Sequence, residues 1–251
     1  MADLFTPLLA VFAVIGFIIG FSKTSIGGVA AIGVAVAALV MPAKESTAAI
    51  LAVLIVGDLV AIRFFGRHVD WSLLRSLVPA VVPGIVLGTL FLAWVSDEVL
   101  RRSIGAMILA LVALQLWARW RRDGHEQGRR SRADHPLMAA ITGTAAGFTT
   151  MTANAAGSVM TLYFAAKGVD KARFVGSFAW FFLGVNLAKV PFSVGLGLMT
   201  WADVGRAVIV VPAVVLGGLA GRALLRRLRQ EQFEVAVLLG SGLAGLLLVT
   251  S

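Results

Sequence analysis

The sequence lacks cysteine altogether and contains little charge. Disulfide bonds and thiolate metal sites are therefore excluded, and because the three histidines lie in loops we expect no metal site. Charged residues make up 14% of the 251 residues, whereas a soluble domain has roughly 25%. Hydrophobic residues make up 59%, and the mean hydropathy is +0.92. This composition excludes an ordinary soluble domain and indicates a protein that lies mostly in lipid.

The sequence also lacks the short motifs that carry enzymatic chemistry. It has no His-Glu-x-x-His, no Gly-x-Ser-x-Gly, no phosphate-binding loop and no pair of carboxylates within an apolar segment. We therefore expect neither an enzyme nor a bound cofactor. The net charge of +9 comes mainly from lysines and arginines in short loops between apolar segments. Cytoplasmic loops of membrane proteins collect such residues, so nucleic acid is not an expected partner.

Apolar segments follow one another along the whole chain. Runs of roughly 17–25 apolar residues cross a hydrocarbon core of about 30 Å, so the chain is predicted to be an all-α polytopic membrane protein. The first and fifth segments are unusual because glycine, serine and threonine interrupt them. The segments lie at 4–40, 46–62, 73–95, 103–118, 137–166, 174–197, 204–221 and 232–250.

The two halves of the chain repeat one pattern about 127 residues apart. Gly-Phe-Ser at 20–22 in the first half corresponds to Gly-Phe-Thr at 147–149 in the second. Each triplet opens a polar break in a long apolar segment, and the break contains Lys23 in the first half and Asn154 in the second. Two hydrophobic halves that each begin with a polar break are typical of transporters built from structural repeats.

The charge of the loops predicts how the segments 4–40 and 137–166 are arranged. If both return as hairpins and the linker 119–136 is cytoplasmic, 16 lysines and arginines lie in inside loops and four outside. If both cross once, ten lie on each side. The positive-inside rule favours the hairpins. Each half then has a hairpin and three spans, an odd number of crossings, which predicts two inverted-topology repeats at 1–118 and 137–251, joined by a basic linker.

Lys23 is the first candidate for a ligand-binding residue. An ammonium group near the bilayer centre costs at least about 2.5 kcal/mol by insertion scales, so its presence needs a reason. With the hydroxyls of Ser22 and Thr24, and the free N–H groups of a helix that starts near Gly28, it could bind an anion. Alternatively, Lys23 reaches the membrane interface or pairs with Asp58.

The second half supplies a matching set of polar residues. Asn154 lies in the second break near Thr150, and its amide offers two donors and one acceptor; the alternative is that these residues only let helices pack closely. Asn186 and Lys189 are three residues apart and share a helix face. Both are candidate ligand contacts, although Lys189 could instead reach the membrane interface.

Asp58 is the only carboxylate well inside an apolar segment. Intramembrane acids often carry protons in coupled transporters, so Asp58 is a candidate coupling residue. The alternative is a permanent ion pair with Lys23 or Arg63.

Short motifs recur along both halves of the chain. They are Gly-Phe-Ser-Lys-Thr at 20–24, Pro-Ala-Lys-Glu-Ser at 42–46, Gly-Asp-Leu-Val-Ala at 57–61, Gly-Phe-Thr-Thr-Met at 147–151, Asn-Ala-Ala-Gly at 154–157, Phe-Val-Gly-Ser at 174–177 and Asn-Leu-Ala-Lys-Val-Pro-Phe at 186–192. Together they resemble the TauE/SafE family of sulfite and organosulfonate exporters. The resemblance covers nearly the whole chain except the linker 119–136, and the one departure is Ser158, where a proline is expected.

The resemblance implies a multi-pass permease of the bacterial cytoplasmic membrane for small sulfur oxyanions or sulfonates. The expected partners are a small anion and the lipid bilayer, and association between copies of the chain is left open. The expected mechanism is export by alternating access, with the anion between the two breaks. A passive anion channel and a permease for another small organic acid are the alternatives.

Overall fold

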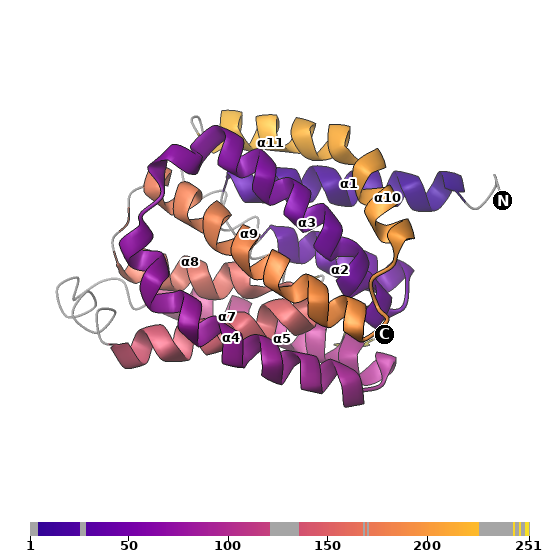
Figure 1. Cartoon of the computed structure of the whole chain (residues 1–251), viewed down its shortest axis with the longest axis horizontal. Helices are drawn as coiled ribbons and strands as arrows, with labels where there is room; N and C mark the ends of the chain where they lie inside the picture. Colours follow the sequence, from indigo (N-terminus) through magenta and orange to yellow (C-terminus); the bar gives the residue numbers. More distant parts are fainter. Residues whose placement is uncertain are drawn as a thin grey trace.

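A computed structural model describes most of the chain, and every regular element in the described ranges is a helix (Figure 1). This agrees with the predicted all-α class. Most of the predicted linker and most of the last apolar segment, 232–250, lie outside the described residues. The described residues are 5–25, 29–120, 136–167, 169, 171–225, 243, 246, 249 and 250.

The helices follow the predicted apolar segments closely. Each segment from 46–62 to 204–221 coincides with one helix or with two consecutive helices. The elements are α1 (Phe5–Thr24), α2 (Ala30–Val40), α3 (Ala43–Phe65), η1 (Gly66–His68), α4 (Trp71–Trp94), α5 (Asp97–Trp120), α7 (Pro136–Ala153), α8 (Ala156–Ala166), α9 (Lys171–Gly195), α10 (Trp201–Ile209) and α11 (Val211–Leu225).

Several helices are long and apolar enough to cross a bilayer. Among the described residues there are three, Ala43–His68, Trp71–Trp94 and Ala172–Gly195, and there are up to four if α10 and α11 form one bent span. The two parts of that span meet at an angle of 53°. Pro212 lies at the second position of α11, where its missing N–H needs no partner within the helix.

Both interrupted segments are divided into two helices at the polar break. α1 ends at Thr24 and α2 begins at Ala30, and α2 folds back beside α1 (Figure 1). A Cβ atom added to Gly33 of α2 would lie 3.6 Å from the side chain of Ile18 in α1. α8, like α2, has only 11 residues, which at 1.5 Å per residue gives about 16 Å, roughly half of a bilayer core.

Two helix pairs join the two halves of the chain. α1 packs along α11 on one side of the molecule, and α4 packs along α7 on the opposite side (Figure 1). Both contacts are close because glycine removes the side chain: a Cβ atom on Gly20 would come within 1.9 Å of the Val214 carbonyl oxygen, and one on Gly147 within 2.2 Å of the Val81 carbonyl oxygen. Small residues allow this backbone approach between membrane helices.

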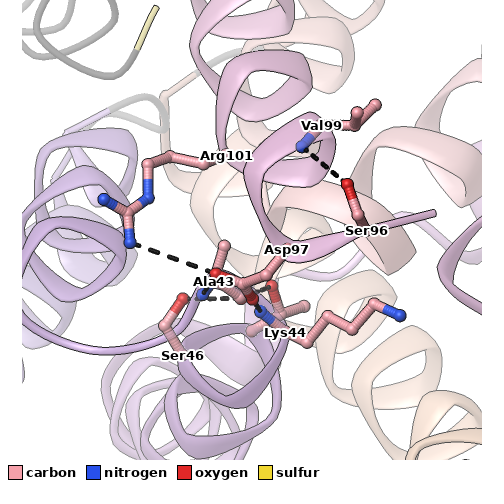
Figure 2. A network of polar contacts seen from close by, with 8 residues as sticks. Ala43, Lys44, Ser46, Ser96, Asp97, Val99 and Arg101 are labelled. Carbon is pink, nitrogen blue, oxygen red and sulfur yellow. Dashed lines mark hydrogen bonds and ion pairs between the residues drawn. The ribbon is translucent and has the colours of Figure 1, made fainter. Parts of the chain in front are cut away.

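The helices α3 and α9 cross the middle of the molecule between these two pairs (Figure 1). The amino end of α3 is held by a carboxylate from another helix, as Figure 2 shows. Asp97, the first residue of α5, accepts hydrogen bonds from the backbone N–H groups of Ala43 at 3.0 Å and Lys44 at 2.9 Å. These N–H groups have no partner within α3, so Asp97 caps the helix. Its negative charge also interacts favourably with the positive end of the helix dipole.

The other end of α3 connects to α9 through the loop before α4. Asp70 caps α4 by accepting a hydrogen bond from the Ser72 N–H at 3.1 Å, and its own N–H donates to the Ser177 hydroxyl of α9 at 2.8 Å. Hydrogen bonds from Ser72 lower the pKa of the Asp70 carboxyl below its usual value. Both ends of α3 are thus fixed by polar contacts that leave its middle part available to the site.

Replacing Gly20 with alanine places a methyl group against the Val214 carbonyl oxygen. Because overpacking of this kind costs about 1–3 kcal/mol, we expect the apparent melting temperature in detergent to fall by roughly 3–10 °C. The matched control is Gly184→Ala in α9, where an added Cβ atom meets nothing within 4 Å. Alanine favours a helix over glycine by about 1 kcal/mol, so this control should melt at the wild-type temperature or above. Equal stability of the two variants would contradict the close contact.

Replacing Asp97 with alanine removes the cap of α3. Loss of a capping side chain costs about 0.5–2 kcal/mol, so we expect the apparent melting temperature to fall by a few degrees, and Asp97→Asn to lose less because one acceptor oxygen remains. The control is Glu98→Ala, which removes an exposed ion pair with Arg102 worth little to stability. If Asp97→Ala and Glu98→Ala have the same apparent melting temperature, the cap contributes nothing to the stability of the protein.

Candidate functional site

The predicted site residues gather inside the protein, where α3 and α9 cross and the two breaks meet them. Every one that the structure describes is buried, which is unusual for polar side chains. Gly28 lies outside the described residues. The exposed fractions are 3% for Ser22, 5% for Lys23, 0% for Thr24, 0% for Asp58, 2% for Thr150, 6% for Asn154, 0% for Asn186 and 1% for Lys189.

Lys23 and Asp58 form a buried ion pair between α1 and α3. The Lys23 Nζ lies 2.6 Å from the Asp58 Oδ1 and 4.4 Å from the centre of the Phe182 ring. Asn186 of α9 donates from its Nδ2 to the Asp58 Oδ2 at 2.7 Å. Buried charges are tolerated when they are paired and hydrogen-bonded. Of the alternatives that the sequence left open for Lys23, the pairing with Asp58 is the one present in this structure.

Lys189 and Asn154 form a second buried cluster, between α9 and the break that separates α7 from α8. The Lys189 Nζ donates to the Asn154 Oδ1 and lies 3.4 Å from the Thr150 Oγ1. The Asn154 Nδ2 donates to the Thr47 carbonyl oxygen of α3 at 3.0 Å. Asn154 has a φ of +48°, a left-handed conformation that asparagine adopts more readily than most residues. The residue that directly follows α7 is thus also a hydrogen-bond partner of Lys189.

The two lysines differ in how their charge is balanced. The partners of Lys189 are a neutral amide and a neutral hydroxyl, and in the described part of the chain no carboxylate forms an ion pair with it. An ammonium group that is buried without a counter-charge is costly. The described carboxylates therefore provide no counter-charge for Lys189.

Asn186 contributes a second unsatisfied group. An ionised carboxylate can only accept hydrogen bonds, so the amide nitrogen of Asn186 has to face Asp58 and its Oδ1 has to face the other way. This Oδ1 is buried and has no hydrogen-bond partner among the described residues. Asn186 and Lys189 are three residues apart on α9, hence on the same face of the helix.

The hydroxyls of the first break make contacts within the protein. The Ser22 Oγ accepts a hydrogen bond from the Ala30 N–H at 3.0 Å and so bridges α1 and α2. The Thr24 Oγ1 donates to the Gly218 carbonyl oxygen of α11 at 2.8 Å. These contacts fix the shape of the break and its attachment to α11. That either hydroxyl contacts a ligand stays a prediction.

Two contributors to the site were not among the predicted residues. Thr47 takes part through its carbonyl oxygen, which carries no signal in the sequence because every residue has one. Phe182 lies under the Lys23 ammonium group, and its spacing of four residues from Asn186 placed it on the same helix face. In the ranges that the structure describes, no three His, Asp or Glu residues lie together as a metal site would require.

The ion pair itself can be tested by removing one partner or both. Lys23→Met leaves the Asp58 carboxylate buried without its partner, which costs about 3–5 kcal/mol, so we expect a clear fall in the apparent melting temperature or in the folded yield. The double variant Lys23→Met/Asp58→Asn removes both charges and should recover much of that loss. A double variant no more stable than the single one would show that the two side chains are not coupled.

Comparison with known families gives one match. The model of the sulfite exporter TauE/SafE family matches residues 12–248, which include both polar breaks and all the predicted site residues. Among curated proteins and solved structures, none matches the chain significantly. The match confirms the resemblance that the sequence motifs suggested, and this family consists of transporters and not of enzymes. The chain therefore belongs to the TauE/SafE family of sulfite exporters and is a multi-pass membrane transporter.

Proposed function

We propose that the protein exports sulfite or a small organosulfonate across the bacterial cytoplasmic membrane. The observation that carries the proposal is the buried Lys189, which lacks a carboxylate partner among the described residues. A small anion supplies the missing negative charge. Membership of the TauE/SafE family supports the choice of a sulfur oxyanion, because the site chemistry alone fits any small anion.

In this proposal the anion lies between the two breaks, near the crossing of α3 and α9. Lys189 is its main counter-charge, and Lys23 becomes a second one when its ion pair with Asp58 is broken. Asp58 stays the candidate coupling residue, because protonation of its carboxyl group would release Lys23 from the ion pair. The hydrogen-bonding groups are those of Ser22, Thr24, Gly28, Thr150, Asn154 and Asn186.

We further propose that the chain consists of two inverted repeats, 1–118 and 137–251, joined by a basic cytoplasmic linker at 119–136. The pattern of helix packing supports this arrangement. The first helix of each half packs through a glycine, Gly20 or Gly147, against a later helix of the other half. A two-fold relation between the halves would produce such a reciprocal pair of contacts, with α3 and α9 meeting near its axis.

Transport then proceeds by movement of one half against the other. Each described site residue is at most 6% exposed, so these residues have almost no contact with the surrounding water in this conformation. A closed central site is what a carrier passes through between its two open states, whereas an open channel keeps a continuous water path. The closed site therefore favours a carrier over a channel.

The proposal is tested by uptake of radiolabelled sulfite into vesicles that contain the purified protein. Lys189→Met removes charge-assisted hydrogen bonds worth about 1.5–3 kcal/mol, so we expect uptake at a fixed low concentration to fall at least about tenfold. Lys44→Met is the matched control, because Lys44 is a partly exposed lysine at the start of α3 and is not among the proposed site residues, and this variant should transport like the wild type.

The same vesicles distinguish a carrier from a channel. A carrier exchanges labelled for unlabelled anion and so shows saturable counterflow when the vesicles are preloaded with sulfite. Undiminished transport by Lys189→Met would contradict the site, and transport without counterflow would contradict the mechanism.

A further inference from the structure

We infer that the site accepts a singly charged oxyanion that also carries a hydrogen-bond donor, and discriminates against doubly charged anions. This inference rests on the proposed function and narrows its substrate class. Two observations carry it: the balance of the charges on Lys23, Asp58 and Lys189, and the oxygen of Asn186 that has no partner among the described residues.

The charge balance follows from the contacts of the two lysines. The Lys23 ammonium group lies 2.6 Å from the Asp58 carboxylate, and both side chains are buried, so this pair is neutral as a unit. Lys189 has only neutral partners in the described part of the chain. With Lys189 protonated, the described residues of the site therefore carry one positive charge without compensation. One negative charge neutralises it, and a second would be buried without a partner and close to the Asp58 carboxylate.

The requirement for a donor follows from Asn186. Its amide nitrogen is fixed by the hydrogen bond to the Asp58 Oδ2 at 2.7 Å, which leaves its Oδ1 as a buried acceptor with no donor among the described residues. A bare oxyanion oxygen next to this carbonyl is repelled, whereas a hydroxyl or N–H group of the ligand satisfies it. Asn186 and Lys189 lie about one turn apart on the same face of α9, so in this inference one ligand contacts both side chains.

Hydrogensulfite fits both conditions, since it has one charge and one proton, and so does a hydroxyalkanesulfonate. Sulfite and sulfate dianions fit neither. The site thus selects its ligand by the number of charges and by a hydrogen bond, and not by the sulfur atom itself. Both contacts come from one helix, α9: Lys189 binds the charged group of the ligand, and Asn186 accepts a hydrogen bond from its donor.

Three ligands of similar size separate these effects: ethanesulfonate, hydroxyethanesulfonate and ethanedisulfonate. Their dissociation constants are measured by calorimetry on the purified full chain at constant ionic strength. A hydrogen bond contributes about 0.5–1.5 kcal/mol, so hydroxyethanesulfonate should bind roughly two- to tenfold more tightly than ethanesulfonate. Ethanedisulfonate should bind at least about tenfold more weakly than ethanesulfonate, because its second charge has no partner.

Asp58→Asn provides the charge test, because it keeps the shape of the side chain and releases the charge of Lys23. The site then has two uncompensated positive charges, and we expect the preference to invert toward ethanedisulfonate. The double variant Lys23→Met/Asp58→Asn is the matched control: it returns the site to one positive charge and should again prefer a singly charged ligand. If Asp58→Asn does not fold, the dissociation constants of the three ligands for the wild-type protein still test the inference.

The outcomes distinguish this inference from the proposed function. If wild-type protein binds ethanedisulfonate as tightly as ethanesulfonate, the charge balance is wrong while the anion site stands. If hydroxyethanesulfonate and ethanesulfonate bind equally, the role of the Asn186 oxygen is wrong. If none of the three ligands nor sulfite binds, the anion site and the proposed function fail together with the inference.

Discussion

The cost of burying lysine in a membrane protein is the constraint on which the rest of this structure depends. Two lysines lie within the helical core and are almost inaccessible to water, and each needs compensation for its lost hydration. Lys23 obtains it from Asp58 at 2.6 Å, whereas the partners of Lys189 among the described residues are an amide and a hydroxyl. This difference between a paired and an unpaired lysine is the basis of the proposed anion site at Lys189.

The helix packing serves to bring these groups together. Glycines in α1 and α7 let the two interrupted segments approach helices of the opposite half at backbone distance. The crossing helices α3 and α9 are then enclosed on both sides, so that their polar side chains meet the breaks and not the lipid. Polar breaks are tolerated at this depth because protein surrounds them. The close packing of the helices and the placement of the buried polar side chains therefore depend on the same arrangement of helices.

Much of the site could be predicted because charged and amide side chains are rare in apolar segments. Lys23, Asp58 and Lys189 each stood out by residue type alone, and Asn154 by its position in the second half of a repeated pattern. The contributions of the Thr47 carbonyl oxygen and of the Phe182 ring could not be predicted in this way. A backbone carbonyl has no sequence signal, and one phenylalanine among fifteen becomes special only when an ammonium group lies over it.

The sequence by itself determined that the chain is helical, that it lies in a membrane, where its long segments are interrupted and to which family it belongs. These properties follow from hydropathy, from glycine and hydroxyl positions and from local motifs, all of which act over short stretches of chain. Only the tertiary structure decided which lysine is neutralised and which is not. Asp58 and Asn186 are 128 residues apart in the sequence. The cost of burying a charged side chain shows that it needs a partner, but not which residue that partner is. The crossing of α3 and α9 decides this, because it brings the two side chains together.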